Sequence, residues 1–169
     1  AIREARKSDV IVLCIGENTY TEKPGDINDL NLHPLQKKLA IELAKTKKPI
    51  ILLINSGRPR IITDIENLSS ATINLYLPGN YGGDALSDIL LGKVNPSGKL
   101  PYSYPSYVNS LVPYNYKPSD VQNNSQGAYN YVGEVNYLYP FGFGLSYSSF
   151  EYSNFEVDKN IYKINDTIK

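Results

Sequence analysis

Two uninterrupted apolar runs constrain the fold of this chain more than any other feature. They read DVIVLCIG at residues 9–16 and IILLIN at residues 50–55, and each has the length of a single strand. Continuous runs of this kind are typical of parallel strands that are buried on both faces. Cys14 lies inside the first run, so we expect a buried structural thiol there. The two runs predict strands of a parallel sheet.

A helical pattern separates the two runs. From Leu35 to Leu43, apolar residues recur at helical spacing and charged residues occupy the other side. Pro34 fits the first position of a helix, and His33 stands where the N-cap would be. We therefore expect His33 to start a helix rather than to take part in catalysis.

The alternation of helix and strand continues after residue 55. SGRPR reads as a turn, and the sequence then predicts a short helix in IITDIENL (61–68), a strand in INLYLPG (73–79) and a helix at residues 82–92. Such alternation predicts an α/β fold with a mostly parallel sheet sandwiched between helices. The opening AIREARKS reads as the tail of a helix, so we expect this fold to be incomplete at its N-terminus.

Charge and composition exclude several classes of partner. The 169 residues include 17 Lys and Arg and 17 Asp and Glu, and this balance argues against nucleic acid or an anionic membrane as the main partner. One Cys and one His are too few for a zinc site, so we expect no metal. No apolar run approaches the roughly 20 residues of a membrane span.

The alternation stops after residue 100. Residues 101–148 are rich in Tyr, Asn and Pro, and we expect them to wrap a surface or to pack against a neighbouring domain, with a mobile tip at residues 122–127. Residues 151–169 then alternate apolar and polar side chains at a period of two, which predicts a strand of a β-sandwich.

The candidate chemistry lies directly after the first apolar run. Glu17, Glu22 and Asp26 fall in ENTYTEKPGD, a polar segment with a strong turn signal at Pro24 and Gly25. In an open α/β sheet, ligands bind at the loops that leave the carboxyl ends of the strands. We therefore expect the functional carboxylates on this loop.

Four segments in the right order resemble a known family. They read GENTYTEKPGD, NSGRPR, YLPGNYGGDALSDILLGKVNPSGKLPYSYP and YPFGFGLSYSSFEYSNF, and together they span about residues 9–155. In these segments the chain resembles the C-terminal α/β-sandwich domain of glycoside hydrolase family 3, the family of β-glucosidases and β-xylosidases.

The resemblance implies a domain organisation and a set of partners. Residues 1–148 are expected to form part of the family's C-terminal α/β domain, without its first strand or strands, and residues 149–169 the beginning of a fibronectin type III-like β-sandwich. The partners are then an N-terminal barrel domain, which supplies an Asp nucleophile, and a β-linked glucoside or related oligosaccharide. No cofactor is implied, the fragment alone is expected to be inactive, and family habit places such proteins outside the cell or in the periplasm.

The resemblance also assigns roles on the loop. The family's general acid/base is a Glu in a TE-x-x-GD setting, which Glu22 matches. Glu17 is expected to be structural or to support the site, and Asp26 to fix the loop through hydrogen bonds to the backbone. Tyr20 either lines the sugar site or packs within the loop, and Lys23 is expected to point to solvent.

Two other classes of function are compatible with parts of the sequence. A non-catalytic carbohydrate-binding or scaffold module would use Glu22 only to order the loop. A nucleotide-binding α/β domain would use the glycines of PGNYGGDAL (78–86), but their spacing matches neither common phosphate-binding motif. Asp84 would also repel a phosphate at the start of the helix.

Overall fold

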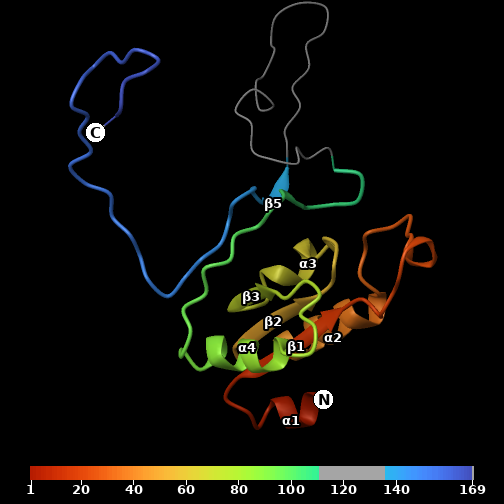
Figure 1. Ribbon diagram of the computed structural model, residues 1–169. Coiled ribbons are helices and arrows are strands. Elements are labelled where there is room, and N and C mark those ends of the chain that lie inside the picture. Colours follow the sequence, from red (N-terminus) through yellow and green to blue (C-terminus); the bar gives the residue numbers. More distant parts are fainter. Residues whose placement is uncertain (111–135, 169) are drawn as a thin grey trace, which may run out of the picture.

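A three-stranded parallel sheet forms the centre of the chain (Figure 1). The computed structural model describes residues 1–110 and 136–168, so the tip expected at residues 122–127 lies outside the described residues. The strands are β1 (Ile11–Gly16), β2 (Ile50–Asn55) and β3 (Ala71–Asn74), in the order β1-β2-β3. This arrangement confirms the α/β fold with a parallel sheet.

The helices fall where the apolar periodicity predicts them. They are α1 (Ile2–Ala5), α2 (Pro34–Ala44), α3 (Thr63–Glu66) and α4 (Gly82–Leu90), and a 3-10 turn, η1, spans Lys23–Gly25. His33 is the N-cap of α2, and its Nδ1 accepts a hydrogen bond of 3.2 Å from the backbone N–H of Leu35. This cap satisfies one of the unpaired N–H groups of the first turn and confirms the structural role expected for His33.

The core lies on one face of the sheet. Alternate strand residues point to this face because successive side chains of a strand point to opposite sides. They pack with residues of α1, α2 and the α3 region and with Tyr104, and the buried set is Ala5, Ile11, Leu13, Ile15, Leu32, Ala40, Leu43, Ile50, Leu52, Ile54, Ile62, Ile65 and Tyr104. Leu35, in the first turn of α2, does not belong to it and is 68% exposed.

The expectation that the first strand is buried on both faces is wrong. Along β1, buried and exposed residues alternate, Val12 is 53% exposed and Cys14 is exposed as well. Leu53 of β2, paired with Cys14 in the register, is buried on the same face. The described residues therefore cover this face over β2 but leave it open over β1, which is why Cys14 is not a buried thiol.

Residues 100–105 and 137–144 return across the α/β unit as two adjacent segments. Their short strands β4 (Tyr104–Pro105) and β5 (Tyr137–Tyr139) are antiparallel. The pairing extends beyond the strands, because Leu100 donates to Phe143 O and Gly142 donates to Leu100 O, both at 2.8 Å. The described part of this region thus wraps the surface of its own domain.

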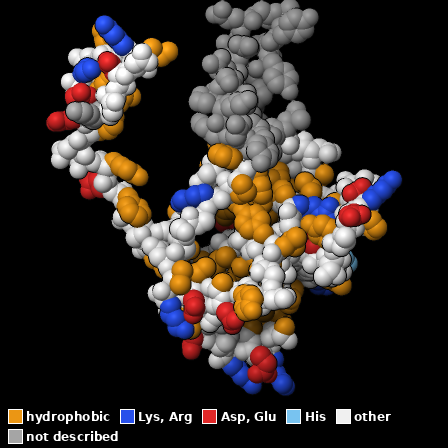
Figure 2. Space-filling view, in the orientation of Figure 1, with side chains coloured by type: hydrophobic (Ala, Val, Ile, Leu, Met, Phe, Trp, Pro, Cys, Tyr) orange, Lys and Arg blue, Asp and Glu red, His pale blue; other side chains and the backbone are white. Residues whose placement is uncertain are grey.

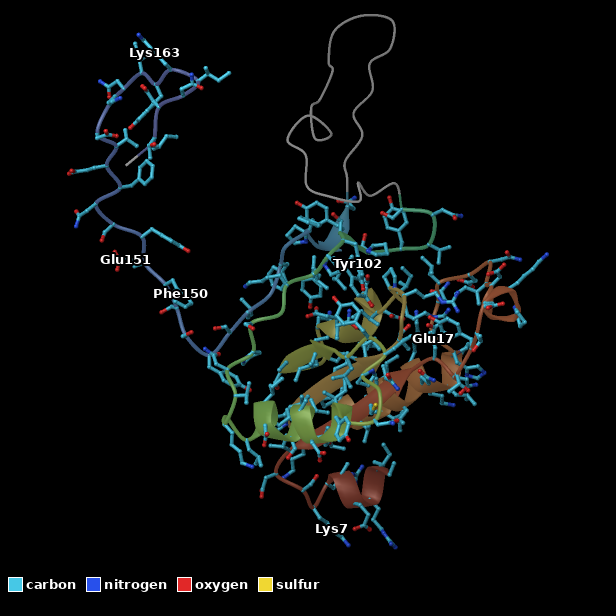
Figure 3. The ribbon with its side chains drawn as sticks, in the orientation of Figure 1. Lys7, Glu17, Tyr102, Phe150, Glu151 and Lys163 are labelled. Atoms are coloured by element: carbon cyan, nitrogen blue, oxygen red, sulfur yellow. The ribbon has the colours of Figure 1, made fainter. Side chains whose placement is uncertain are left out.

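Aromatic rings hold this return segment against the sheet. Tyr102, which Figure 3 labels just below β5, contacts Tyr76 and Tyr104 at ring-centroid distances of 6.4 and 6.1 Å. Tyr139 continues the row, 6.2 Å from Tyr104 and 4.8 Å from Phe143. Edge-to-face and stacked contacts of this kind stabilise the fold beyond the gain from burying the rings. The many tyrosines after residue 100 therefore have a structural use.

The strand expected at residues 151–169 does not form in the described part of that segment. Residues 151–168 contain no strand and leave the α/β unit as an extended chain (Figure 1). Their hydrophobic side chains, Tyr152 and Phe155 among them, are exposed. Figure 2 shows hydrophobic side chains standing free along this segment. A strand needs a neighbour to complete its hydrogen bonds, and no described strand lies beside this one. Its assignment to a second domain stays a prediction.

Within residues 1–110 and 136–168, no helix has the length and apolar character needed to cross a membrane. The same residues hold no group of three or more His, Cys, Asp or Glu side chains suited to a metal ion.

Candidate functional site

The candidate site is built on the loop of residues 17–33, which leaves the carboxyl end of β1. Gly16 marks its start with a φ of +154°, and a Cβ at this position would lie 2.0 Å from the carbonyl oxygen of Asn55. The side-chain amide of Gln36 holds the same residue from α2, with hydrogen bonds of 3.0 Å to its N–H and to its C=O. The last residue of β1, from which the loop starts, is therefore fixed from both sides.

Glu17 sits at the centre of a cluster of ion pairs. Its Oε1 accepts from Arg58 Nε at 2.9 Å and from Arg60 Nη1 at 3.2 Å. The hydroxyl of Ser56 lies 2.6 Å from Glu17 Oε2, and the Glu17 side chain is only 9% exposed. In Figure 3 it lies between the sheet and the loop. Both carboxylate oxygens are thus engaged by residues of the loop that follows β2.

The two arginines extend from Glu17 to separate parts of the site loop. Arg58 Nη2 donates to the carbonyl of Gly25 at 2.7 Å, and its guanidinium lies 4.1 Å from the centroid of the Tyr20 ring. Arg60 donates instead to the carbonyls of Asp29 and Asn31. Charge-assisted bonds to backbone carbonyls and a cation–π contact are among the stronger polar interactions.

Glu22 lies on the arc of residues 20–25, whose ends, Tyr20 and Gly25, both contact Arg58. It is exposed, with φ 49° and ψ −144°, and its carbonyl accepts from the N–H of Gly25 at 2.9 Å. Among the described residues, no hydrogen bond or ion pair engages its carboxylate. A positive φ is costly for a residue with a Cβ, and such conformations are found preferentially at functional sites.

The other expected residues are arranged around this arc. One face of the Tyr20 ring is covered by Arg58, and the ring packs so closely on Gly25 that a Cβ there would lie 2.6 Å from Tyr20 Cδ2. Asp26 is exposed and donates its N–H to Lys23 O at 3.0 Å, and no described residue forms a hydrogen bond or ion pair with its carboxylate. Lys23 is exposed, as expected.

The sequence interpretation missed the residues that brace the loop. It treated SGRPR as a turn and assigned no role to Ser56, Arg58 or Arg60. The signal was available, because Glu17 ends β1 and the arginines follow β2, and the carboxyl ends of adjacent parallel strands meet at the same edge of a sheet. A carboxylate and two guanidinium groups placed there should pair.

One cavity of the described chain lies away from the site loop. It has a volume of about 510 Å³ and runs beside β3, with Tyr76, Tyr104, Tyr139 and Phe143 in its lining. No residue of the site loop lines it, and its one carboxylate, that of Glu66, accepts a hydrogen bond from the hydroxyl of Tyr139. A second hollow, of about 650 Å³, is lined by the later part of the loop, with Asp29, Asn31 and His33 among its residues. Glu22 and Asp26 line neither cavity and are exposed.

Comparison with known proteins identifies a family that matches the whole α/β unit. Residues 1–147 match the family described as glycosyl hydrolase family 3 C-terminal domain. A lysosomal beta glucosidase of Dictyostelium discoideum is 40% identical over 156 residues, covering 91% of this chain and 18% of the relative. A beta-xylosidase of Formosa agariphila is 36% identical over 169 residues, covering 99% of this chain and 23% of the relative. The chain thus spans about a fifth of the length of these curated relatives.

The fold agrees with solved structures. A beta-glucosidase from Listeria innocua, solved in complex with isofagomine, superposes with a TM-score of 0.77 at 29% identity, over 92% of this chain and 23% of that one. Fold and sequence therefore lead to one conclusion: the chain belongs to glycoside hydrolase family 3, as the family's C-terminal domain.

Proposed function

We propose that this chain is the second domain of a retaining, exo-acting β-glycosidase, in which Glu22 is the general acid/base. The observation that carries the proposal is the contrast between two glutamates on one loop. The Glu17 carboxylate is occupied by Arg58, Arg60 and Ser56, whereas the Glu22 carboxylate is exposed and unengaged among the described residues. Membership of the family and the names of the relatives support the class of reaction.

The chemistry needs two carboxyl groups with different tasks. A nucleophilic Asp attacks the anomeric carbon while Glu22 donates its proton to the departing glycosidic oxygen, which leaves a covalent glycosyl-enzyme. Glu22, now a carboxylate, takes a proton from the water that attacks the same carbon, and the sugar leaves with its configuration retained. Retaining glycosidases hold the two carboxyl groups about 5–5.5 Å apart.

The second carboxyl group is assigned to an N-terminal barrel domain of a longer protein, which we call the parent protein. The loop of residues 17–33 projects from the edge of the sheet, and the site on this chain is open rather than enclosed. An acid carried on such a loop can reach across a cleft between two domains. The substrate is then a β-linked glucoside or xyloside, since the relatives carry both names.

The remaining assignments follow from this arrangement. Glu17 serves as the anchor of the loop. Tyr20 and Asp26 support the loop or contact the sugar. Residues 149–169 begin a fibronectin type III-like domain. The lysosomal name of one relative supports an exported protein, secreted or periplasmic.

The test uses the parent protein as wild type and as Glu22→Ala. With aryl β-glucosides and β-xylosides whose leaving groups are poor, we expect kcat/KM to fall by about 10²–10⁴-fold, because general acid help is lost. With activated leaving groups the first step is spared, and a burst of the phenol should precede slow hydrolysis of the glycosyl-enzyme. Lys23→Ala, a neighbour on the same arc, is the matched control.

An unchanged rate in Glu22→Ala would remove the acid/base role from this residue. A wild-type parent that binds sugars and hydrolyses none of these glycosides would instead favour a carbohydrate-binding module.

A further inference from the structure

We propose that Arg58 is the positioning residue of Glu22: it fixes the arc that carries the acid/base by contacting that arc on both sides. The inference rests on the proposed function of Glu22. It concerns a residue that would touch neither substrate nor the reacting atoms.

Three contacts hold the Arg58 guanidinium in one orientation. Nε donates to Glu17 Oε1 at 2.9 Å, and Nη2 donates to Gly25 O at 2.7 Å. The face of the group covers the Tyr20 ring at 4.1 Å. The first contact ties the group to the end of β1, and the other two reach the loop. A planar group with several fixed donors suits such a role, whereas an ammonium cannot reproduce it.

The two loop contacts flank Glu22 in the sequence and meet in space. Tyr20 and Gly25 are in such close contact that a Cβ on Gly25 would lie 2.6 Å from the Tyr20 ring, and Gly25 N–H bonds to Glu22 O at 2.9 Å. Residues 20–25 therefore form a closed arc with Arg58 across its base. Glu22 keeps a φ of 49° within it. A costly backbone conformation persists only where its surroundings enforce it, and Arg58 is the side chain from outside the loop that does so here.

Arg60 provides an internal comparison. It shares Glu17 Oε1 at 3.2 Å, but its other bonds go to the carbonyls of Asp29 and Asn31. Leu30 O also accepts from Ile61 N–H at 2.9 Å, so the later part of the loop is held without Arg58. Substitution of Arg60 perturbs the same ion-pair cluster without touching the arc of Glu22.

The experiment uses the parent protein with Arg58→Lys, Arg58→Ala and Arg60→Lys beside wild type and Glu22→Ala. For substrates with poor leaving groups, we expect Arg58→Lys to lower kcat by about 10–10²-fold with little change in KM, because displacement of a catalytic group by about 1 Å costs this much. For substrates with activated leaving groups, kcat should fall far less. The variant's kcat should therefore depend more steeply on leaving-group quality than the wild-type kcat does. The basic limb of the pH–rate profile should move as well. Arg60→Lys should lower the melting temperature to a similar degree and keep the wild-type leaving-group dependence and pH profile.

Tyr20→Ala tests whether Arg58 acts through the Tyr20 ring. It should reproduce part of the Arg58→Lys effect and add little to it in the double variant.

Two outcomes would overturn the inference while leaving the role of Glu22 intact. In one, Arg58→Lys retains the wild-type leaving-group dependence. In the other, Arg58→Lys and Arg60→Lys lose activity equally on all substrates, as general destabilisation would cause. Failure of Glu22→Ala itself to show the leaving-group signature would overturn the proposed function, and the positioning role with it.

Discussion

At the scale of single residues, the two glutamates of the site loop differ in what surrounds them. Glu17 is enclosed by two guanidinium groups and a hydroxyl, whereas Glu22, five residues later, carries an exposed carboxylate on a strained backbone. A residue that is fully hydrogen-bonded is poorly suited to exchanging protons with a substrate. The environment, more than the residue type, therefore separates the anchor from the candidate acid.

We expect Glu17→Gln to destabilise the protein while the exposed Glu42→Gln does not. The first change leaves Arg58 and Arg60 without their counter-charge. It should lower the free energy of unfolding by up to about 3 kcal/mol. This value is the low end of the range for buried ion pairs, because the Arg58 side chain is 24% exposed. Glu42 pairs with Lys45 on the surface, where such pairs are worth about 0–1 kcal/mol. Denaturation midpoints of the parent protein measure both, and equal shifts would contradict the anchor role.

Much of the residue-level account was available from the sequence. His33 was placed correctly as the N-cap because its position before Pro34 is a local signal. Cys14 was placed wrongly, because a continuous apolar run does not say whether the rest of the chain covers both faces. Arg58 and Arg60 were missed, since their partners are about forty residues away and only the sheet brings them together.

At the scale of elements, the alternation of strand and helix was predicted well. In the described residues, β1, β2 and the helices fall where the period of the apolar residues and the helix-start signals place them. The third strand, β3, spans Ala71–Asn74 rather than the expected residues 73–79. The segment at residues 151–168 shows the limit of that approach. Its period of two is a strand pattern, but a strand forms only when a neighbour supplies the other half of each hydrogen bond, and the pattern does not contain the neighbour.

The row of tyrosines predicts how the packed return segment responds to alkali. Burial raises the pKa of Tyr102 to about 12. Burial also raises the pKa of Tyr104 and of Tyr139, the latter with a further contribution from Glu66. A pKa that is higher in the folded than in the unfolded state contributes stability that is complete below pH 10 and is lost as pH rises through about 12.

Between neutral pH and about pH 10, denaturation midpoints should therefore stay level, and above about pH 10 they should fall, together with late ionisation of these tyrosines in the absorbance spectrum. Tyr104→Phe should weaken the dependence on pH, and the exposed Tyr107→Phe should leave it unchanged. If both variants kept the full wild-type dependence, the buried row would not be its cause.

At the scale of the whole molecule, the proposed function gives this chain one member of a catalytic pair, the exposed Glu22. We expect the isolated chain to bind or turn over no aryl β-glucoside at a rate above that of the buffer, because the nucleophile is assigned to another domain. Mixing with a separately produced N-terminal domain should restore turnover where the two associate. Measurable hydrolysis by the chain alone would place both carboxyl groups on it and contradict the division.

The most direct test of the account is azide rescue of Glu22→Ala in the parent protein. Azide attacks the glycosyl-enzyme without needing a general base, so turnover of an activated aryl β-glycoside should recover toward the wild-type rate and yield a β-glycosyl azide. That product, of retained configuration, would establish both the double displacement and the role of Glu22. Loss of activity without azide rescue, or a product of inverted configuration, would contradict the central claim.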